Sequence, residues 1–115
     1  MFDEHFAQLP EISPERKARW GDIAAITQKM LGEAKAERWV EVAELDKQRR
    51  RLLEAFFTPA VMPDEAAAVA ERIKWVLDVD KEILAIGKSA RTELRQKMGG
   101  MAQRRRVNTA YTDNM

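Results

Sequence analysis

Residues 69–98 read VAERIKWVLDVDKEILAIGKSARTELRQKM, and this stretch decides the fold. Its apolar or small residues recur at alternating spacings of four and three, which is the pattern of a helix that packs along one face. The recurring positions, with one carboxylate among them, are Val69, Ile73, Val76, Asp80, Ile83, Gly87, Ala90, Leu94 and Met98. Together with Asp64-Glu65 at its start, the pattern predicts one helix over 64–98, about 50 Å long at 1.5 Å per residue.

Two shorter helices are predicted before it. Ser13-Pro14 supplies a capping hydroxyl followed by a proline at the first helical position, and the apolar period that follows predicts a helix over 14–36. The period restarts at Trp39 and predicts a helix over 38–57, which Thr58-Pro59 and Pro63 end.

The end of the long helix carries two adjacent glycines. Gly99-Gly100 cost about 2 kcal/mol of helix propensity relative to two alanines, so we expect a hinge there and a short last helix over 101–111. The predicted fold is all-α: an antiparallel bundle of three main helices plus a short C-terminal helix. Residues 1–13 form a loose N-terminal segment, 14–112 one bundle domain and 113–115 a tail. The expected core is Trp20, Ile23, Met30, Trp39, Val42, Leu53, Phe56, Ile73, Val76, Ile83 and Leu94.

The amino-acid composition supports an all-α fold and indicates the cellular compartment in which the protein works. Ala, Glu, Lys, Leu and Arg make up 57 of the 115 residues, a proportion typical of long helices, so a mostly β fold is excluded. The sequence has no cysteine, which excludes thiolate metal sites and suits a reducing compartment. It contains neither a secretion signal nor 18 consecutive apolar residues, so we expect a cytoplasmic protein without membrane insertion.

Candidate catalytic and metal-binding residues are few. The single histidine, His5, has no clustered ligands nearby, and most of the 19 acidic residues alternate with Lys or Arg on polar helix faces. The two serines, Ser13 and Ser89, have no histidine placed to activate them. We therefore expect neither an enzyme nor a cofactor or metal.

Asp80 is the most informative polar residue, because it falls on the apolar face of the longest helix, where a carboxylate needs a partner. Arg49 is the obvious candidate. A turn centred near residue 60 or 61 would place Arg49 opposite position 72, about 12 Å along the axis from Asp80, which argues against that pair. The sequence therefore indicates another partner or a solvated position.

Charge is distributed unevenly. Residues 1–87 carry a net charge of −4 and residues 88–115 carry +5, including the cluster Arg104 to Arg106. Such clusters can bind nucleic-acid phosphates, although no helix-turn-helix or zinc-finger pattern is present and an acidic protein surface is the better partner. Val107 and Tyr111 follow the cluster and either fold onto the bundle or anchor a partner.

Several segments, taken in order, resemble the small flagellar chaperone family FliT. They are Arg19-Trp20 with Ile23, Trp39 to Val42 with Leu45-Asp46, Arg49 to Leu53, Ile73 with Leu77 to Asp80, and Arg91, Leu94 and Gln103 to Tyr111. The resemblance covers about residues 14 to 112 and depends on order and spacing rather than on any single signature.

The resemblance implies a cytoplasmic type III export chaperone that binds the flagellar filament-cap protein FliD, prevents its premature assembly and delivers it to the export apparatus. Some members of that family also bind FlhC, a subunit of the flagellar master transcription regulator, and export ATPase components, so the resemblance extends the expected partners to these proteins. The alternative is a basic helical regulator that binds nucleic acid directly.

Two predictions concern binding surfaces. We predict that partner binding uses the end of the long helix and the segment after it, at Leu94, Met98, Arg104, Val107 and Tyr111. Eight apolar residues between Trp75 and Ile86, more than one neighbouring helix needs, predict a homodimer in the absence of a client.

Overall fold

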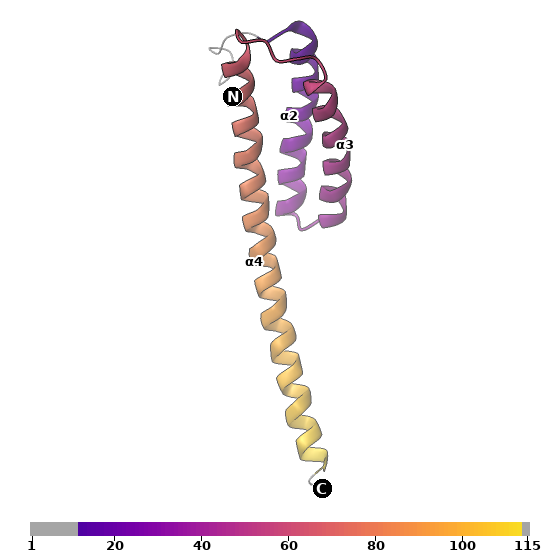
Figure 1. Ribbon diagram of the computed structural model, residues 1–115. Helices are drawn as coiled ribbons and strands as arrows, with labels where there is room; N and C mark the ends of the chain where they lie inside the picture. Colours follow the sequence, from indigo (N-terminus) through magenta and orange to yellow (C-terminus); the bar gives the residue numbers. More distant parts are fainter. Residues whose placement is uncertain (1–11, 114–115) are drawn as a thin grey trace. The chain divides into compact units, whose positions relative to one another are not determined.

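A computed structural model describes residues 12–113, with side chains described as far as Gly99. This part of the chain contains three α-helices and no strand: α2 (Pro14–Lys35), α3 (Trp39–Phe57) and α4 (Ala66–Asp113) (Figure 1). The predicted all-α fold is therefore confirmed. The chain divides into two compact units, with the boundary inside α4 between Ile83 and Leu84.

Both ends of α2 have well-defined caps. The backbone N–H of Arg16 donates to the Ser13 hydroxyl over 3.3 Å and Pro14 begins the helix, which confirms the predicted start. At the other end, Arg38 N–H donates to the Glu33 carbonyl and Glu37 N–H to the Ala34 carbonyl, with Glu37 at a φ of 60°. This is the Schellman arrangement, in which glycine is the usual residue at the left-handed position. The cap lets α3 begin directly after a tight turn.

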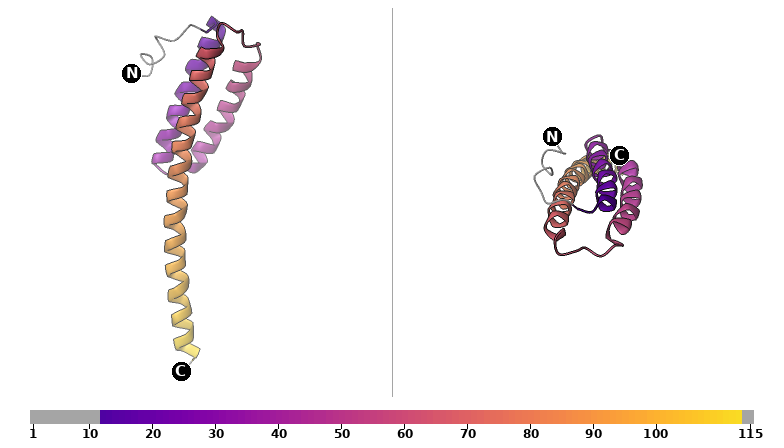
Figure 2. Two further views of the ribbon diagram at one scale, coloured as in Figure 1. Left: turned by 60° about the vertical axis from the view of Figure 1, so that its left-hand side comes forward. Right: turned by 90° about the horizontal axis from the view of Figure 1, so that it is seen from above.

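The first unit contains α2, α3 and α4 as far as Ile83. Successive helices in it run in alternating directions, and α2 lies beside both of the others (Figures 1 and 2). Their shared core is formed by Ile12, Trp20, Ile23, Ala24, Phe56, Ala68, Val69 and Val76. Trp20 on α2 contacts both other helices, with its ring 5.8 Å from the Trp75 ring and 6.5 Å from the Phe56 ring.

Most of the predicted core lies in this unit. Six of the predicted core residues are buried, namely Trp20, Ile23, Met30, Phe56, Val76 and Ile83. Four are half-buried, namely Trp39, Val42, Leu53 and Ile73.

Leu94 was wrongly predicted to belong to the core, because its side chain is 57% exposed. The reason is helix length. The 22 residues of α2 and the 19 of α3 span about 33 and 28 Å, whereas the 48 residues of α4 span about 72 Å. Two short helices cannot cover the whole apolar face of a helix twice their length.

The predicted hinge at Gly99-Gly100 is also wrong, because α4 continues through both glycines to Asp113. No separate last helix over 101–111 is formed. A propensity cost of about 2 kcal/mol lowers the stability of a helix but does not end it when helix-forming residues follow and no proline removes a hydrogen bond.

Candidate partner-binding surface

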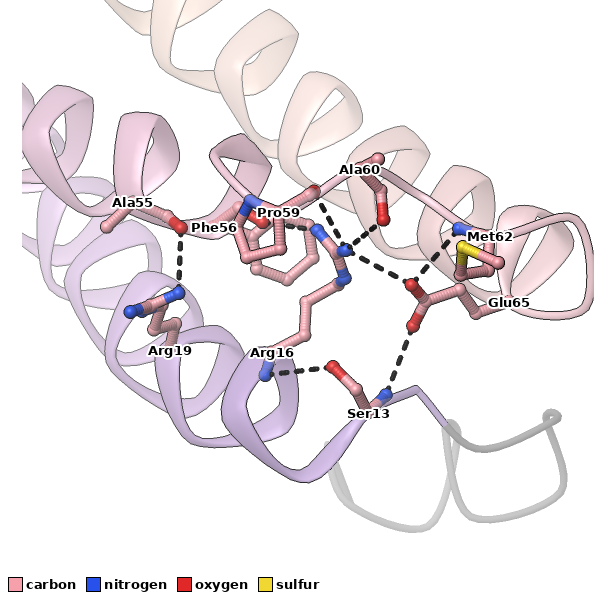
Figure 3. A network of polar contacts seen from close by, with 9 residues as sticks. All are labelled: Ser13, Arg16, Arg19, Ala55, Phe56, Pro59, Ala60, Met62 and Glu65. Carbon is pink, nitrogen blue, oxygen red and sulfur yellow. Dashed lines mark hydrogen bonds and ion pairs between the residues drawn. The ribbon is translucent and has the colours of Figure 1, made fainter.

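Arg16 joins the start of α2 to the connection between α3 and α4 (Figure 3). Its guanidinium donates to the carbonyl of Phe56, to those of Pro59 and Ala60 at 3.0 and 3.1 Å, and to Glu65 at 3.1 Å. The Arg16 side chain is buried. Because these acceptors include the free carbonyls at the end of α3, the contacts fix how the chain leaves that helix.

Glu65 completes this network. Its carboxylate accepts the backbone N–H of Ser13 at 3.1 Å and that of Met62 at 3.3 Å, in addition to the Arg16 guanidinium. The bond from Met62, three residues earlier, closes the turn that precedes α4, in which the Glu65 N–H also donates to the Met62 carbonyl at 3.0 Å. The Ser13 N–H, with smaller contributions from Met62 and Arg16, lowers the pKa of Glu65 despite the opposing effect of burial.

Arg49 and Asp80 form a second network, so the expectation that Asp80 has another partner or a solvated position is wrong. The Arg49 guanidinium donates to both carboxylate oxygens of Asp80, at 2.8 and 2.9 Å, and also to Thr27 and Asp46 at 3.3 Å. Arg49 is buried and Asp80 is half-buried. The carboxylate on the apolar face of α4 therefore has a bidentate partner, which is the strongest geometry for such a pair.

Arg49 reaches Asp80 because α3 and α4 do not meet at a tight, level turn, as the expected register required. The connection instead spans residues 58–65, and α4 begins beyond the end of α3 (Figure 1). This offset moves later residues of α4 back toward Arg49, and a long arginine side chain covers the remaining distance.

Both networks hold the helices of the first unit together, because the guanidinium groups of Arg16 and Arg49 donate to oxygen atoms of the protein itself. Residues 12–99, whose side chains the structure describes, contain no group of three or more His, Asp or Glu side chains placed to hold a metal ion. His5 lies outside the described residues. A cleft of about 320 Å³ lies between α2 and α3, but its lining mixes both charges, with Lys29 and Arg38 beside Glu33, Glu41 and Glu44. Because positive and negative side chains line the same cleft, its charge does not favour an anionic or a cationic ligand.

The second unit presents a different surface. The residues that continue the apolar face of α4 beyond Ile83 are Gly87, Ala90, Leu94 and Met98, and we call these four the exposed stripe. Leu94 is 57% and Met98 58% exposed, whereas Gly87 and Ala90 are partly exposed. Successive members are three or four residues apart and therefore share one side of the helix.

The surroundings of the exposed stripe are basic. Residues 84–99 contain Lys88, Arg91, Arg95 and Lys97 but a single acid, Glu93, which gives a net charge of +3. All five side chains are exposed. No ion pair involves any of them within the described part of the chain.

The predicted site residues are only partly described. Leu94 and Met98 lie together on the exposed stripe. Arg104, Val107 and Tyr111 lie within α4, but their side chains are outside the described residues. Sequence reasoning used Glu65 as a helix-start signal but did not pair it with Arg16, although Arg16 lies in the first turn of one predicted helix and Glu65 at the start of another. It also did not group Lys88, Arg91 and Arg95, although their spacing of three and four residues places them on one side of a helix.

The described helices include none with the length and apolar character needed to cross a membrane. The fold and the exposed stripe define the class: a small all-α protein whose longest helix has an uncovered apolar face. Within this class the chain belongs to the FliT family, since the family model described as flagellar protein FliT matches residues 17–113. It is therefore a member of a family of flagellar export chaperones. Neither a characterised protein nor a solved structure gave a significant match.

Proposed function

We propose that this protein binds the flagellar filament-cap protein FliD in the cytoplasm, prevents its premature assembly and delivers it to the type III export apparatus. Membership of the FliT family supports this proposal. The observation that carries it is the exposed stripe, because Leu94 and Met98 are more than half exposed at neighbouring positions on one helix face.

The chemistry of the exposed stripe suits an α-helical client segment. Apolar residues at spacings of three and four match the spacing of anchors on a partner helix, which is the basis of recognition between amphipathic helices. Gly87 and Ala90 allow close approach of a second backbone, while Leu94 and Met98 supply apolar area. Covering such a face would also keep the client's own apolar face from assembling prematurely.

The first test is binding of the full chain to FliD by isothermal titration calorimetry. We expect the double variant Leu94→Ala/Met98→Ala to weaken binding by about 2 kcal/mol, or about 30-fold, as loss of two central anchors usually does. The matched control is Val40→Ala/Met62→Ala, which removes two exposed apolar side chains, at 73% and 58% exposure, in the first unit. Equal loss in both variants would refute the assignment of the site, and absence of binding by the wild-type chain would refute the function.

Tyr111 gives a second test of the site. If Tyr111 is a partner anchor, Tyr111→Ala weakens FliD binding by about 2 kcal/mol and leaves thermal stability unchanged. A variant that melts several degrees lower yet binds normally would place Tyr111 in the fold and not in the site.

The proposal extends to FlhC, to export ATPase components and to a homodimer. The exposed side chains of Leu77 and Leu84 support self-association of the free chain. Sedimentation at about 100 μM checks this, since contacts worth about 6 kcal/mol would register there. The alternative, a basic regulator that binds nucleic acid, predicts a steep loss of duplex binding with salt in a gel shift.

A further inference from the structure

The charges beside the exposed stripe are arranged asymmetrically. Successive helical residues are about 100° apart, so the residue after each stripe member lies on one flank and the residue before it lies on the other. The residues after Gly87, Ala90 and Leu94 are Lys88, Arg91 and Arg95. This flank carries three cations and no acid.

The opposite flank is neutral. The residues before Ala90, Leu94 and Met98 are Ser89, Glu93 and Lys97, so its single acid and single base cancel. The two sides of one apolar stripe therefore present different charges to any helix that lies on it.

Resting on the proposed function, we infer that the client segment is an amphipathic helix with acidic residues along one flank of its apolar face. Lys88, Arg91 and Arg95 are exposed and have no ion-pair partner among the described residues, so their charges are available to a client. An acidic flank would complement them and fix the direction in which the client helix lies.

The stripe also defines the size of the client segment. Gly87 to Met98 covers 12 residues, about 16 Å of helix, so about three turns of a client helix fill it. Small residues occupy one end of the stripe and large ones the other. The complementary client therefore carries its bulkiest apolar residues opposite Gly87 and Ala90.

Other occupants fit less well. A second copy of the chain would place a net charge of +3 over residues 84–99 against the same charge. A nucleic acid would use the cations but leave Leu94 and Met98 uncovered. An acidic amphipathic helix uses both features.

The test measures binding of the full chain to two synthetic helical peptides by fluorescence anisotropy. The peptides share one leucine face and differ in the flanking residues, which are Glu in one and Lys in the other. We expect the Glu peptide to bind about tenfold more tightly at low salt, with the advantage shrinking as salt is added.

Two charge-reversed variants decide the site. Arg91→Glu/Arg95→Glu should abolish the preference for the Glu peptide, whereas Lys17→Glu/Lys74→Glu, with the same change in net charge, should retain it. Circular dichroism checks that both variants fold. The inference is overturned if the wild-type chain binds both peptides equally, if both variants lose the preference alike, or if Arg91→Glu/Arg95→Glu weakens duplex DNA binding while the peptide preference stays.

Parallel titrations with FliD separate this inference from the proposed function. A wild-type chain that discriminates between the peptides but does not bind FliD would refute the function and leave the inference standing. A chain that binds FliD but shows no peptide preference would refute the inference alone.

Discussion

The two parts of α4 follow the same spacing but differ in the width of their apolar faces. Along residues 66–83, the positions just before the repeating residues include Ala68, Trp75 and Val79, so the apolar face is wide. Along residues 84–99, the corresponding positions include Ser89, Glu93 and Lys97, so the face is narrow. A wide face suits two neighbouring helices, as α2 and α3 provide in the first unit, whereas a narrow one suits a single helix. The spacing of the apolar residues is the same in both parts of α4. The width of the apolar face therefore distinguishes the part that builds the fold from the part available to a client.

The largest expected effect tests whether the fold resides in the first unit. Phe56 is fully buried against Trp20 and Arg16, so Phe56→Ala should lower the free energy of unfolding by about 3–5 kcal/mol. Leu94→Ala, on the narrow face, should change it by less than about 0.5 kcal/mol. Urea denaturation measures both, and a comparable loss in the two variants would contradict the distinction.

A smaller effect is expected from the ion pair on the wide face. Asp80→Ala leaves the buried guanidinium of Arg49 without its bidentate partner, which should cost about 2 kcal/mol, since Asp80 is partly exposed to water. A double-mutant cycle with Arg49→Leu measures the coupling between the two side chains. If the two single substitutions change the free energy of unfolding by amounts that add up in the double variant, the ion pair itself contributes no stability.

Acid should weaken the first unit through Glu65. Because the folded state lowers the pKa of this carboxyl, its stabilising contribution is present above the ordinary pKa of about 4.3 and is lost as the pH falls through the lower, folded value. Glu65→Gln should therefore lower the free energy of unfolding at pH 7 and flatten its decline below about pH 4.3. Unfolding curves between pH 2 and 7 check this, and parallel declines in both proteins would exclude Glu65 as a source.

The smallest expected effect concerns the second unit alone. A Cβ added at Gly99 meets no atom within 4 Å, so Gly99→Ala should stabilise the surrounding helix by up to about 1 kcal/mol through propensity. Amide hydrogen exchange should slow around residue 99 while the midpoint of global unfolding stays unchanged. Faster exchange there would indicate that the glycine is required for the helix.

Local signals predicted much of the fold. Ser13 and Pro14 mark a helix start through contacts within four residues, so sequence spacing is sufficient to find it. Trp20, Ile23, Phe56 and Val76 were recognisable as core residues because helical period determines which face each one occupies.

What could not be predicted depends on the relative position of distant segments. The Arg49–Asp80 pair is set by the path of residues 58–65, and no periodicity encodes that path. Burial of Leu94 could not be judged from its place on the repeat, because the repeat identifies a face but not whether another helix covers it. The hinge at Gly99-Gly100 was predicted from the low helix propensity of glycine alone, without the helix-forming residues that follow.

The long sequence separation of the Arg16 contacts has a consequence for biosynthesis. Arg16 leaves the ribosome well before its acceptors, which lie 40 to 49 residues later in the chain. Until the segment up to Glu65 emerges, the nascent chain carries a cation that the native core can accommodate only with those oxygens in place. The first two helices can therefore form early during translation, but their native docking has to wait for the connection that follows them.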